Sequence, residues 1–456
     1  ADVPEMELVA GLMKINNNPD VNPVRLVEYL RDRAGLLLPR GVGVYTFPHR
    51  TFQEYLAACH LTELNYPVEV AQLACNDPDR WREVVLLAGA KAGGRKGSSF
   101  ALWALVDELC GINVSDPLTK QQAWGALLAG QAVIETVDYQ HLSGYNQVRC
   151  DRVLRHLVDL IQQNSLSAFE RARAGDTLAR LGDPRFDPEL FYLPKEDLLG
   201  FVHIPAGEFI MGSDPRQDKD AQKSEQPQHK LFLPDYYMAR YPVTVAQYSL
   251  FVERTHYDKT YEEYRNGPAN HPVRYVTWYD ARVYCDWLDQ ALRTVPHLPE
   301  ELKQRLDQGW KITLPSEAQW EKAARGTDGR LYPWGNEFDA NKANMGETGI
   351  GTTSAVGCFS LGGGQYGVMD MSDNVNEWTR SLWGKDLEKP VYRYPYSERL
   401  KERENLEAGS DILRVVRGGS FADDSGGACC AFRGRFNPPH GLHNFGFRII
   451  LSPPLS

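Results

Sequence analysis

The secondary-structure signals of the chain change near residue 187. Before that point helix signals recur, whereas short strand-like runs, many glycines and seven of the ten tryptophans follow it. Apolar residues at helical spacing predict packed helices, and short runs between glycine-rich turns predict a mixed or β-rich fold. The 456 residues therefore predict two domains, 1–190 and 191–456, joined by a linker from Pro184 to Pro194.

The first half carries the start and stop signals of helices. Asn22 is a good capping residue ahead of Pro23, and Ser167 with Glu170 forms a capping box that precedes a helix ending at Gly182. Further helical stretches lie at 82–90, 101–110 and 153–162. They predict an all-α domain of paired helices, with a helical repeat as one arrangement of these pairs, although no fixed sequence period emerges.

The second half has few helices, and they are well marked. Capping boxes occur at Thr244 with Gln247 and at Ser316 with Gln319, and a third helix is expected to follow Thr277. Candidate strands lie at 414–417 and 445–451. This half is therefore expected to mix α and β structure with irregular loops.

Charge and composition exclude several classes of partner. The formal net charge of −10 argues against a general affinity for nucleic acid or anionic lipid. The longest apolar run, 84–90, is far below the ~18 residues of a membrane span, so no membrane partner is expected. Residues 1–9 do not read as a secretion signal, and the eight cysteines lack CxxC pairs or a disulfide framework. A cytoplasmic location is expected.

Eight motifs in the second half occur in a fixed order. They are IPAGEFIMGS (204–213), YPVT (241–244), HPVRYVTWYDA (271–281), LPSEAQWEKAARG (314–326), YPWGNE (332–337), DNVNEW (373–378), RVVRGGSF (414–421) and GFRI (446–449). This series resembles the formylglycine-generating enzyme family over 201–451. The resemblance implies an α+β chain in which 191–456 adopts a C-type-lectin-like fold and 1–190 is the all-α domain.

The oxidase chemistry of that family depends on two thiols that bind copper(I). Aligned on Arg433, Cys430 falls where the second thiol lies, but Ser425 or a gap takes the place of the first. Cys429 cannot easily substitute, because neighbouring side chains on an extended strand point to opposite faces. The expectation is therefore no catalytic residue and no enzyme. The alternative is a copper oxidase that acts on cysteine-containing protein substrates.

The same resemblance implies a structural calcium ion held by oxygen ligands. The implied ligands are the side chains or carbonyls of Asn344, Met345, Asp373, Asn374, Val375 and Glu377. Thr348 stands where the family usually has an aspartate, so one site has lost an acid. In the alternative interpretation, Asn374 and Glu377 only brace a loop through hydrogen bonds.

The segment 421–445 has an unusual composition: it contains no Lys, Glu, Gln, Met or Trp. These five residue types cannot be reached when the adenines of an AAC codon are replaced freely. The segment therefore resembles that of variable proteins of diversity-generating retroelements, which carry diversified residues on a lectin-like scaffold. The resemblance implies a variable region at 414–450 that binds a protein or other macromolecular ligand. The candidate contact residues are Phe421, Ala422, Asp424, Gly426, Phe432, Gly434, Phe436, His440, Gly441, Leu442 and His443.

Two alternatives remain for this segment. In the first, Phe421, Phe432 and Phe436 are ordinary core residues and the remainder is loop. In the second, His440 and His443 bind a metal, but no third ligand is obvious nearby. A purely structural module is a further alternative for the whole domain.

The first half resembles part of another family. The string VYTFPHRTFQEYLAACHL (44–61) is similar to the region downstream of the nucleotide-binding core in NACHT-type NTPases, and 171–185 is similar to the helical link that follows such modules. The nearest approach to a phosphate loop, 89–96, lacks the G-K-[ST] ending. ATP hydrolysis is not expected from this chain, and an NTPase module upstream in a longer parent protein is the implied partner.

Overall fold

The computed structural model describes residues 2–15, 22–93, 99–112, 115–136, 141–396 and 400–454. The chain forms two compact units: Ala1–Val114 with Trp124–Arg149, and Ser115–Ala123 with Cys150–Ser456. The predicted domain boundary at residue 190 lies inside the second unit. Of the glycine- and lysine-rich string at 89–96, residues 94–96 lie outside the described ranges, and the preceding residues belong to a helix.

The first unit begins with helices around a small sheet. Its elements are β1 (Val3–Pro4), α1 (Glu5–Ile15), α2 (Pro23–Asp32), β2 (Leu38–Gly41), β3 (Val44–Thr46) and α3 (Arg50–Glu63), and the antiparallel sheet has the order β1-β3-β2. As predicted, Asn22 caps α2 by accepting a hydrogen bond from the backbone N–H of Val24 at 3.0 Å. This sheet was not predicted from the sequence, because strands of two to four residues are too short to show an alternating pattern.

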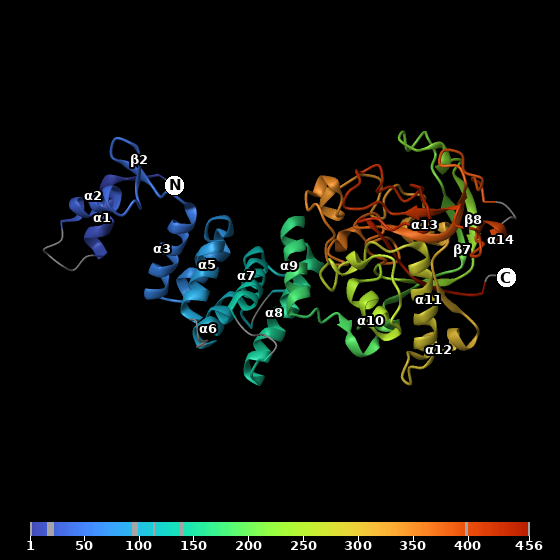
Figure 1. Cartoon of the computed structure of the whole chain (residues 1–456), viewed down its shortest axis with the longest axis horizontal. Coiled ribbons are helices and arrows are strands. Elements are labelled where there is room, and N and C mark those ends of the chain that lie inside the picture. Colours follow the sequence, from blue (N-terminus) through green and yellow to red (C-terminus); the bar gives the residue numbers. More distant parts are fainter. Residues whose placement is uncertain are drawn as a thin grey trace. The chain divides into compact units, whose positions relative to one another are not determined.

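Four more helices lie wholly or partly in the first unit (Figure 1). They are α4 (Val68–Asn76), α5 (Pro78–Gly93), α6 (Ser99–Leu109) and part of α7 (Lys120–Thr136). A Cβ atom built at Gly89 would lie 3.1 Å from a methyl of Leu105, so α5 and α6 pack closely at this point. The helical stretches predicted at 82–90 and 101–110 are therefore confirmed.

The second unit contains α9 (Ala168–Leu181), most of α8 (Gly144–Gln163) and the mixed domain (Figure 1). One four-stranded sheet has the order β10-β15-β9-β6 and another the order β13-β12-β11-β14, with a separate hairpin of β7 and β8. The strands of the first sheet and the hairpin are β6 (Phe201–Ile204), β7 (Gly207–Met211), β8 (His229–Leu233), β9 (Tyr236–Ala239), β10 (Lys311–Thr313) and β15 (Ile450–Ser452). The strands of the second sheet are β11 (Asn376–Gly384), β12 (Leu413–Arg417), β13 (Gly434–Phe436) and β14 (Phe445–Phe447).

The helices of the mixed domain are α10 (Val245–Thr255), α11 (Trp278–Arg293), α12 (Glu300–Asp307) and α13 (Glu317–Arg325). Three of them, α10, α11 and α13, begin where the sequence predicts, whereas α12 has no side-chain cap and was not predicted. Thr244, Thr277 and Ser316 each form a complete capping box with the residue three positions later. These local signals were sufficient because a capping box satisfies backbone donors within a single turn.

The predicted linker is wrong. Residues Phe186–Asp187 (β4) and Leu193–Pro194 (β5) pair in an antiparallel ladder. Phe191 and Leu193 are 6% and 3% exposed and belong to the largest hydrophobic core of the mixed domain. Burial of these two side chains makes the segment part of the fold and not a connection between folds.

The single strand predicted at 445–451 is also wrong. The tail forms two short strands, β14 beside β11 and β15 beside β9, which belong to different sheets. Arg448 lies between them and is fully buried, with its guanidinium against the carboxylate of Glu377 at 2.9 Å. This buried ion pair anchors the tail where it crosses from one sheet to the other.

Helix α9 is attached to the mixed domain by polar contacts. The buried guanidinium of Arg171 donates to the carbonyl oxygens of Leu166, Cys358 and Asn341 at 2.8, 3.2 and 2.6 Å. A Cβ atom built at Gly175 would lie only 2.5 Å from that of Ala355. The last part of the predicted helical domain, from Cys150 onward, therefore belongs structurally to the lectin-like unit. None of the described helices combines the length and apolar character that crossing a bilayer requires.

Candidate functional site

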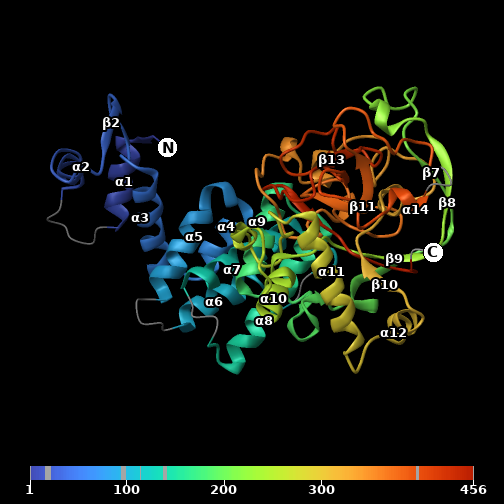
Figure 2. The ribbon, with the colours of Figure 1, turned by 45° about the vertical axis from the view of Figure 1, so that its right-hand side comes forward.

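Both ends of the segment 421–445 are fixed to one sheet (Figure 2). It leaves β12, returns through β13 and ends at the start of β14. Strand β13 pairs with β12 in antiparallel register, with Val416 opposite Gly434, and β14 runs parallel to β11. The loops between these strands therefore start and finish on hydrogen-bonded backbone.

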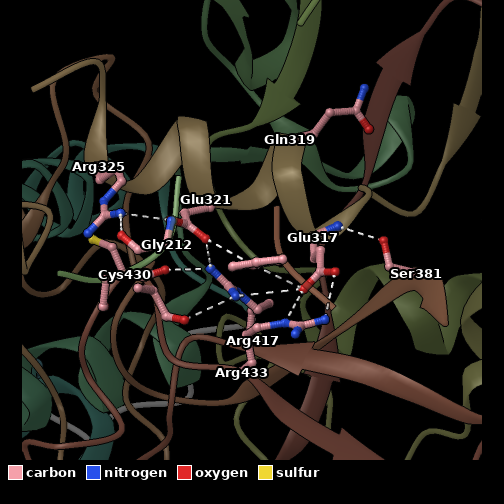
Figure 3. Close-up of polar contacts among 12 residues, drawn as sticks. Gly212, Glu317, Gln319, Glu321, Arg325, Ser381, Arg417, Cys430 and Arg433 are labelled. Atoms are coloured by element: carbon pink, nitrogen blue, oxygen red, sulfur yellow. Dashed lines mark hydrogen bonds and ion pairs between the residues drawn. The ribbon is translucent and has the colours of Figure 1, made fainter. Parts of the chain in front are cut away.

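A buried ion network lies beneath the segment (Figure 3). Glu317 accepts hydrogen bonds from Arg433 at 2.7 and 3.0 Å and from Arg403 at 3.2 Å. Glu321 accepts from Arg417 at 2.6 Å and from Arg325 at 2.8 Å. We call these six residues the Glu317–Glu321 network. Sequence analysis missed it, although residues 317, 321 and 325 are spaced to lie on one face of a helix.

The electrostatics of this network keep Glu317 ionised. Burial by itself raises the pKa of Glu317, but attraction to Arg433, Arg403 and Arg417 outweighs burial and lowers that pKa to about 2. The rings of Trp320 and Trp383 lie 5.3 and 5.1 Å from the guanidinium carbons of Arg417 and Arg433. Because Arg433 lies inside the segment, the network fixes the segment to α13.

The candidate contact residues divide by exposure. Those exposed are Ala422, Asp424, Gly426, His440, Leu442 and His443; those half-buried are Phe432 and Phe436; and those buried are Phe421, Gly434 and Gly441. The exposed positions form two groups, one directly after β12 and one directly before β14. The segment therefore presents a surface on its two loops.

Buried and half-buried candidate positions contact the domain's own core, as the alternative interpretation of the segment expects. A Cβ atom at Gly434 would lie 2.6 Å from Val416, and one at Gly441 would lie 2.8 Å from the backbone of Tyr275. Phe436 packs on Phe445, with ring centroids 4.8 Å apart. These contacts depend on β12, β14 and the loop at 274–278, which sequence spacing alone did not bring next to the segment.

His440 and His443 have separate aromatic neighbours. The ring of His440 lies 6.4 Å from that of Phe436, and the ring of His443 lies 5.9 Å from that of Phe421. Within the described ranges, no cluster of three or more His, Cys, Asp or Glu side chains is arranged to hold a metal ion.

The implied calcium ligands fit only in part. Glu377 does not fit, because its carboxylate is occupied by Arg448 and by the indole N–H of Trp320 at 2.7 Å. The side chain of Asn374 is likewise occupied by Ser354, whose N–H donates to its oxygen at 3.0 Å. The alternative interpretation, loop bracing through hydrogen bonds, describes these two side chains.

Other oxygen atoms near Asp373 have no hydrogen-bond partner among the described residues. The side-chain oxygens Asn344 Oδ1 and Asp370 Oδ1 are buried and have no partner among the described residues. The backbone N–H of Asn344 donates to Asp373 at 2.8 Å. Burial, together with the charge of Asp370, raises the pKa of Asp373 well above its usual range, and burial raises the pKa of Asp370 to about 6. Two desolvated acids beside unpartnered oxygens fit a hard cation, and Asp370 is the donor that sequence analysis missed.

The backbone donors of the implied set are also buried. The carbonyl oxygen of Met345 accepts from the N–H of Thr348 at 3.1 Å, and the N–H of Val375 donates to the carbonyl of Asp373 at 2.7 Å. Both residues therefore belong to the hydrogen-bonded loops around Asn344 and Asp373.

The thiols of the segment are not activated. Cys429 and Cys430 are both free and buried, and burial raises the pKa of each to about 12. Without a metal ion, both thiols are therefore in the neutral, less nucleophilic form at neutral pH. Ser425, at the place of the missing thiol, donates its backbone N–H to Glu347 at 2.8 Å.

Comparison with known proteins agrees with this architecture. The model of the sulfatase-modifying factor enzyme 1-like domain matches residues 188–453, and that of the winged helix-turn-helix domain C-terminal to NACHT matches residues 10–61. The second match covers α2, β2, β3 and most of α3, and it includes the segment 44–61 that resembles NACHT-type proteins.

Individual relatives cover the second half of the chain. The serine/threonine-protein kinase pkn1 of Chlamydia pneumoniae is 29% identical over 276 residues, 56% of this chain and 38% of that protein. The formylglycine-generating enzyme of Mus musculus is 26% identical over 55% of this chain and 74% of that protein. The solved structure of Treponema denticola variable protein 1 is 23% identical, with a TM-score of 0.41, over 56% of this chain and 95% of its own.

The match to the kinases thus spans under two-fifths of their length. The family model, in contrast, covers more than half of this chain and includes every strand from β5 through β15. Through residues 188–453, the chain belongs to the family of sulfatase-modifying factor enzyme 1-like domains.

Proposed function

We propose that the second unit is a non-enzymatic, receptor-like ligand-binding domain, and that 421–445 is its diversified segment, as in the variable proteins of diversity-generating retroelements. The observation that carries this proposal is the contrast within the segment. Six candidate contact positions are exposed, while the backbone between them is held by β13 and the Glu317–Glu321 network.

This arrangement separates recognition from folding. A side chain at an exposed loop position can change without loss of core packing, because surface substitutions away from buried features alter stability by only about 0.5 kcal/mol. Histidine and leucine at 440, 442 and 443 offer apolar and hydrogen-bonding contacts suited to a protein surface. A protein or other macromolecule in the cytoplasm is the proposed ligand.

The buried thiols favour binding over oxidase chemistry. A copper oxidase of this family needs two thiolates, whereas Ser425 or a gap replaces one of them and burial raises the pKa of Cys430 to about 12. The proposed role is therefore recognition without turnover.

The first unit extends the proposal. Its similarity to a winged helix domain that follows NACHT modules supports a parent protein in which ligand binding regulates an upstream NTPase. In that parent, the chain would be the sensing part.

A population sequencing experiment tests the proposed function. The coding DNA for 421–445 is read in many isolates, together with the region for α13 as a conserved control of the same domain. The expected result is substitution confined to the segment and to adenines of an imperfect nearby copy, next to a reverse transcriptase gene. An unvarying segment with no such copy or gene would refute diversification.

A further inference from the structure

Arg274 lies beside the segment 421–445 without a charged partner. Its guanidinium carbon lies 5.7 Å from the ring centroid of Phe421 and 5.8 Å from that of Tyr275. Its one hydrogen bond within the described chain runs from Nη1 to the carbonyl oxygen of His443, at 3.2 Å. No described carboxylate lies within ion-pair distance of it, and burial lowers its pKa.

Several enclosed arginines of this unit have stronger partners, although the buried Nε groups of Arg414 and Arg417 have none among the described residues. Arg417, Arg433 and Arg448 each pair with a glutamate, and Arg171 donates to three carbonyl oxygens. Arg274 is half-buried, and its Nε and Nη2 groups remain open to solvent without a partner among the described residues. It therefore offers two adjacent N–H donors whose hydration is partly replaced by aromatic rings.

Backbone contacts fix Arg274 relative to the second exposed loop. The N–H of Tyr275 donates to the carbonyl of Leu442 at 3.1 Å, and that of Trp278 donates to Pro438 at 3.1 Å. Gly441 fits directly against the backbone of Tyr275 and Val276. The segments 438–443 and 274–278 are therefore packed against each other, and Arg274 lies in the second of them.

We propose that Arg274 is an invariant anchor of the ligand surface, and that it binds a carboxylate of a polypeptide ligand. The inference rests on the proposed function, because it assigns a constant residue to a surface whose neighbouring exposed positions 442 and 443 vary. A planar carboxylate can accept two parallel hydrogen bonds from the free edge of a guanidinium. A single such arginine on a chain of net charge −10 suits an acidic peptide and not a polyanion, which needs a cluster of basic residues.

The variable positions and the anchor have different roles in this scheme. The anchor sets the class of ligand, since a carboxylate must face Arg274. The exposed side chains at 442 and 443 then select among ligands of that class, because their backbone carbonyls are bonded to Tyr275 and Arg274.

Peptide selection on the full chain tests the anchor. Random dodecamers displayed on phage are selected on the wild type, on Arg274→Gln and on Arg216→Gln, whose exposed guanidinium serves as the matched control. We expect one acidic position to be enriched on the wild type and on Arg216→Gln, and to lose its enrichment on Arg274→Gln. Synthetic peptides with free or amidated carboxyl ends then distinguish a side-chain carboxylate from a terminal one.

Affinities of a selected peptide complete the test. A charge-assisted hydrogen bond gives about 10- to 100-fold in affinity, so Arg274→Gln and replacement of the peptide acid by its amide should each weaken binding by that factor, and together by no more than either alone. Unchanged melting of Arg274→Gln shows that the fold is intact. Peptides that bind without an acid, and that lose binding on replacement of His443, would overturn the anchor but leave the binding surface. Selection of no peptide at all would contradict both proposals.

Discussion

Replacing Glu317 by glutamine tests how the segment 421–445 is held. Glutamine keeps the size of the side chain and one carbonyl oxygen, but it removes the charge that faces Arg433, Arg403 and Arg417. Those three guanidinium groups are 0–6% exposed, so water cannot replace the lost partner. The variant is therefore expected to destabilise the second unit strongly.

The magnitude follows from the pKa of Glu317. A change from the ordinary value of 4.5 to about 2 corresponds to roughly 3 kcal/mol. Removal of one partner from a buried ion pair typically costs about 3–5 kcal/mol. Since the pKa is lowered on folding, this stabilisation is complete above pH 4.5 and is lost as the pH falls toward 2. Glu317→Gln should be less stable by about 3 kcal/mol at pH 7, with a weaker loss of stability in acid.

Urea unfolding of the full chain, followed by tryptophan fluorescence, measures this change. Seven of the ten tryptophans follow residue 187, and Trp383 lies 5.1 Å from the guanidinium carbon of Arg433, so the signal reports on the second unit. Glu262→Gln, at an exposed pair with Lys259, is the control and should change stability by less than about 1 kcal/mol. A Glu317→Gln variant as stable as that control, with the acid dependence of the wild type, would refute the role of the network.

Two further predictions concern the attachment of α9 and the cation site. Gly175→Ala should destabilise the second unit by about 1–3 kcal/mol, because the new methyl would meet Ala355. The control is Gly11→Ala, in a helix with open space around this position, which should be neutral or stabilising by up to about 1 kcal/mol. Equal effects of the two substitutions in thermal unfolding would contradict the close contact. Calcium at a hundred times its dissociation constant should stabilise the wild type by about 2.7 kcal/mol relative to the protein in chelator. The substitution Asp373→Asn should remove that difference. Identical melting curves of the wild type with calcium and with chelator would exclude the site.

Helix starts and the family architecture could be predicted from sequence because their signals are local or numerous. Thr244 and Ser316 cap their helices through residues three positions away, and eight ordered motifs marked the lectin-like fold that the structure confirms. The Pro184–Pro194 segment was misjudged for the opposite reason. Its turn-forming residues resemble those of a linker, and only the surrounding core shows that Phe191 and Leu193 are buried.

The candidate surface was predicted less completely than the fold. Gly441 is buried because it lies against the backbone of Tyr275, which is more than 160 positions away in sequence. Glu377 was assigned to a cation by resemblance, but Arg448 reaches it once the tail crosses between sheets. Asp370 and Arg274 carry no spacing signal, since each becomes notable only through the partners that it lacks in three dimensions.

The sequence by itself determined the change from helical to mixed α and β patterns, the helix caps and the lectin-like fold. These features depend on neighbours within a few residues or on many motifs in order. Only the tertiary structure decided which residues of 421–445 are accessible and which acids are neutralised. The physical reason is that burial and charge pairing depend on distances between remote segments. Glu317 on α13 and Arg433 in the segment, for example, are 116 positions apart in sequence but 2.7 Å apart in space.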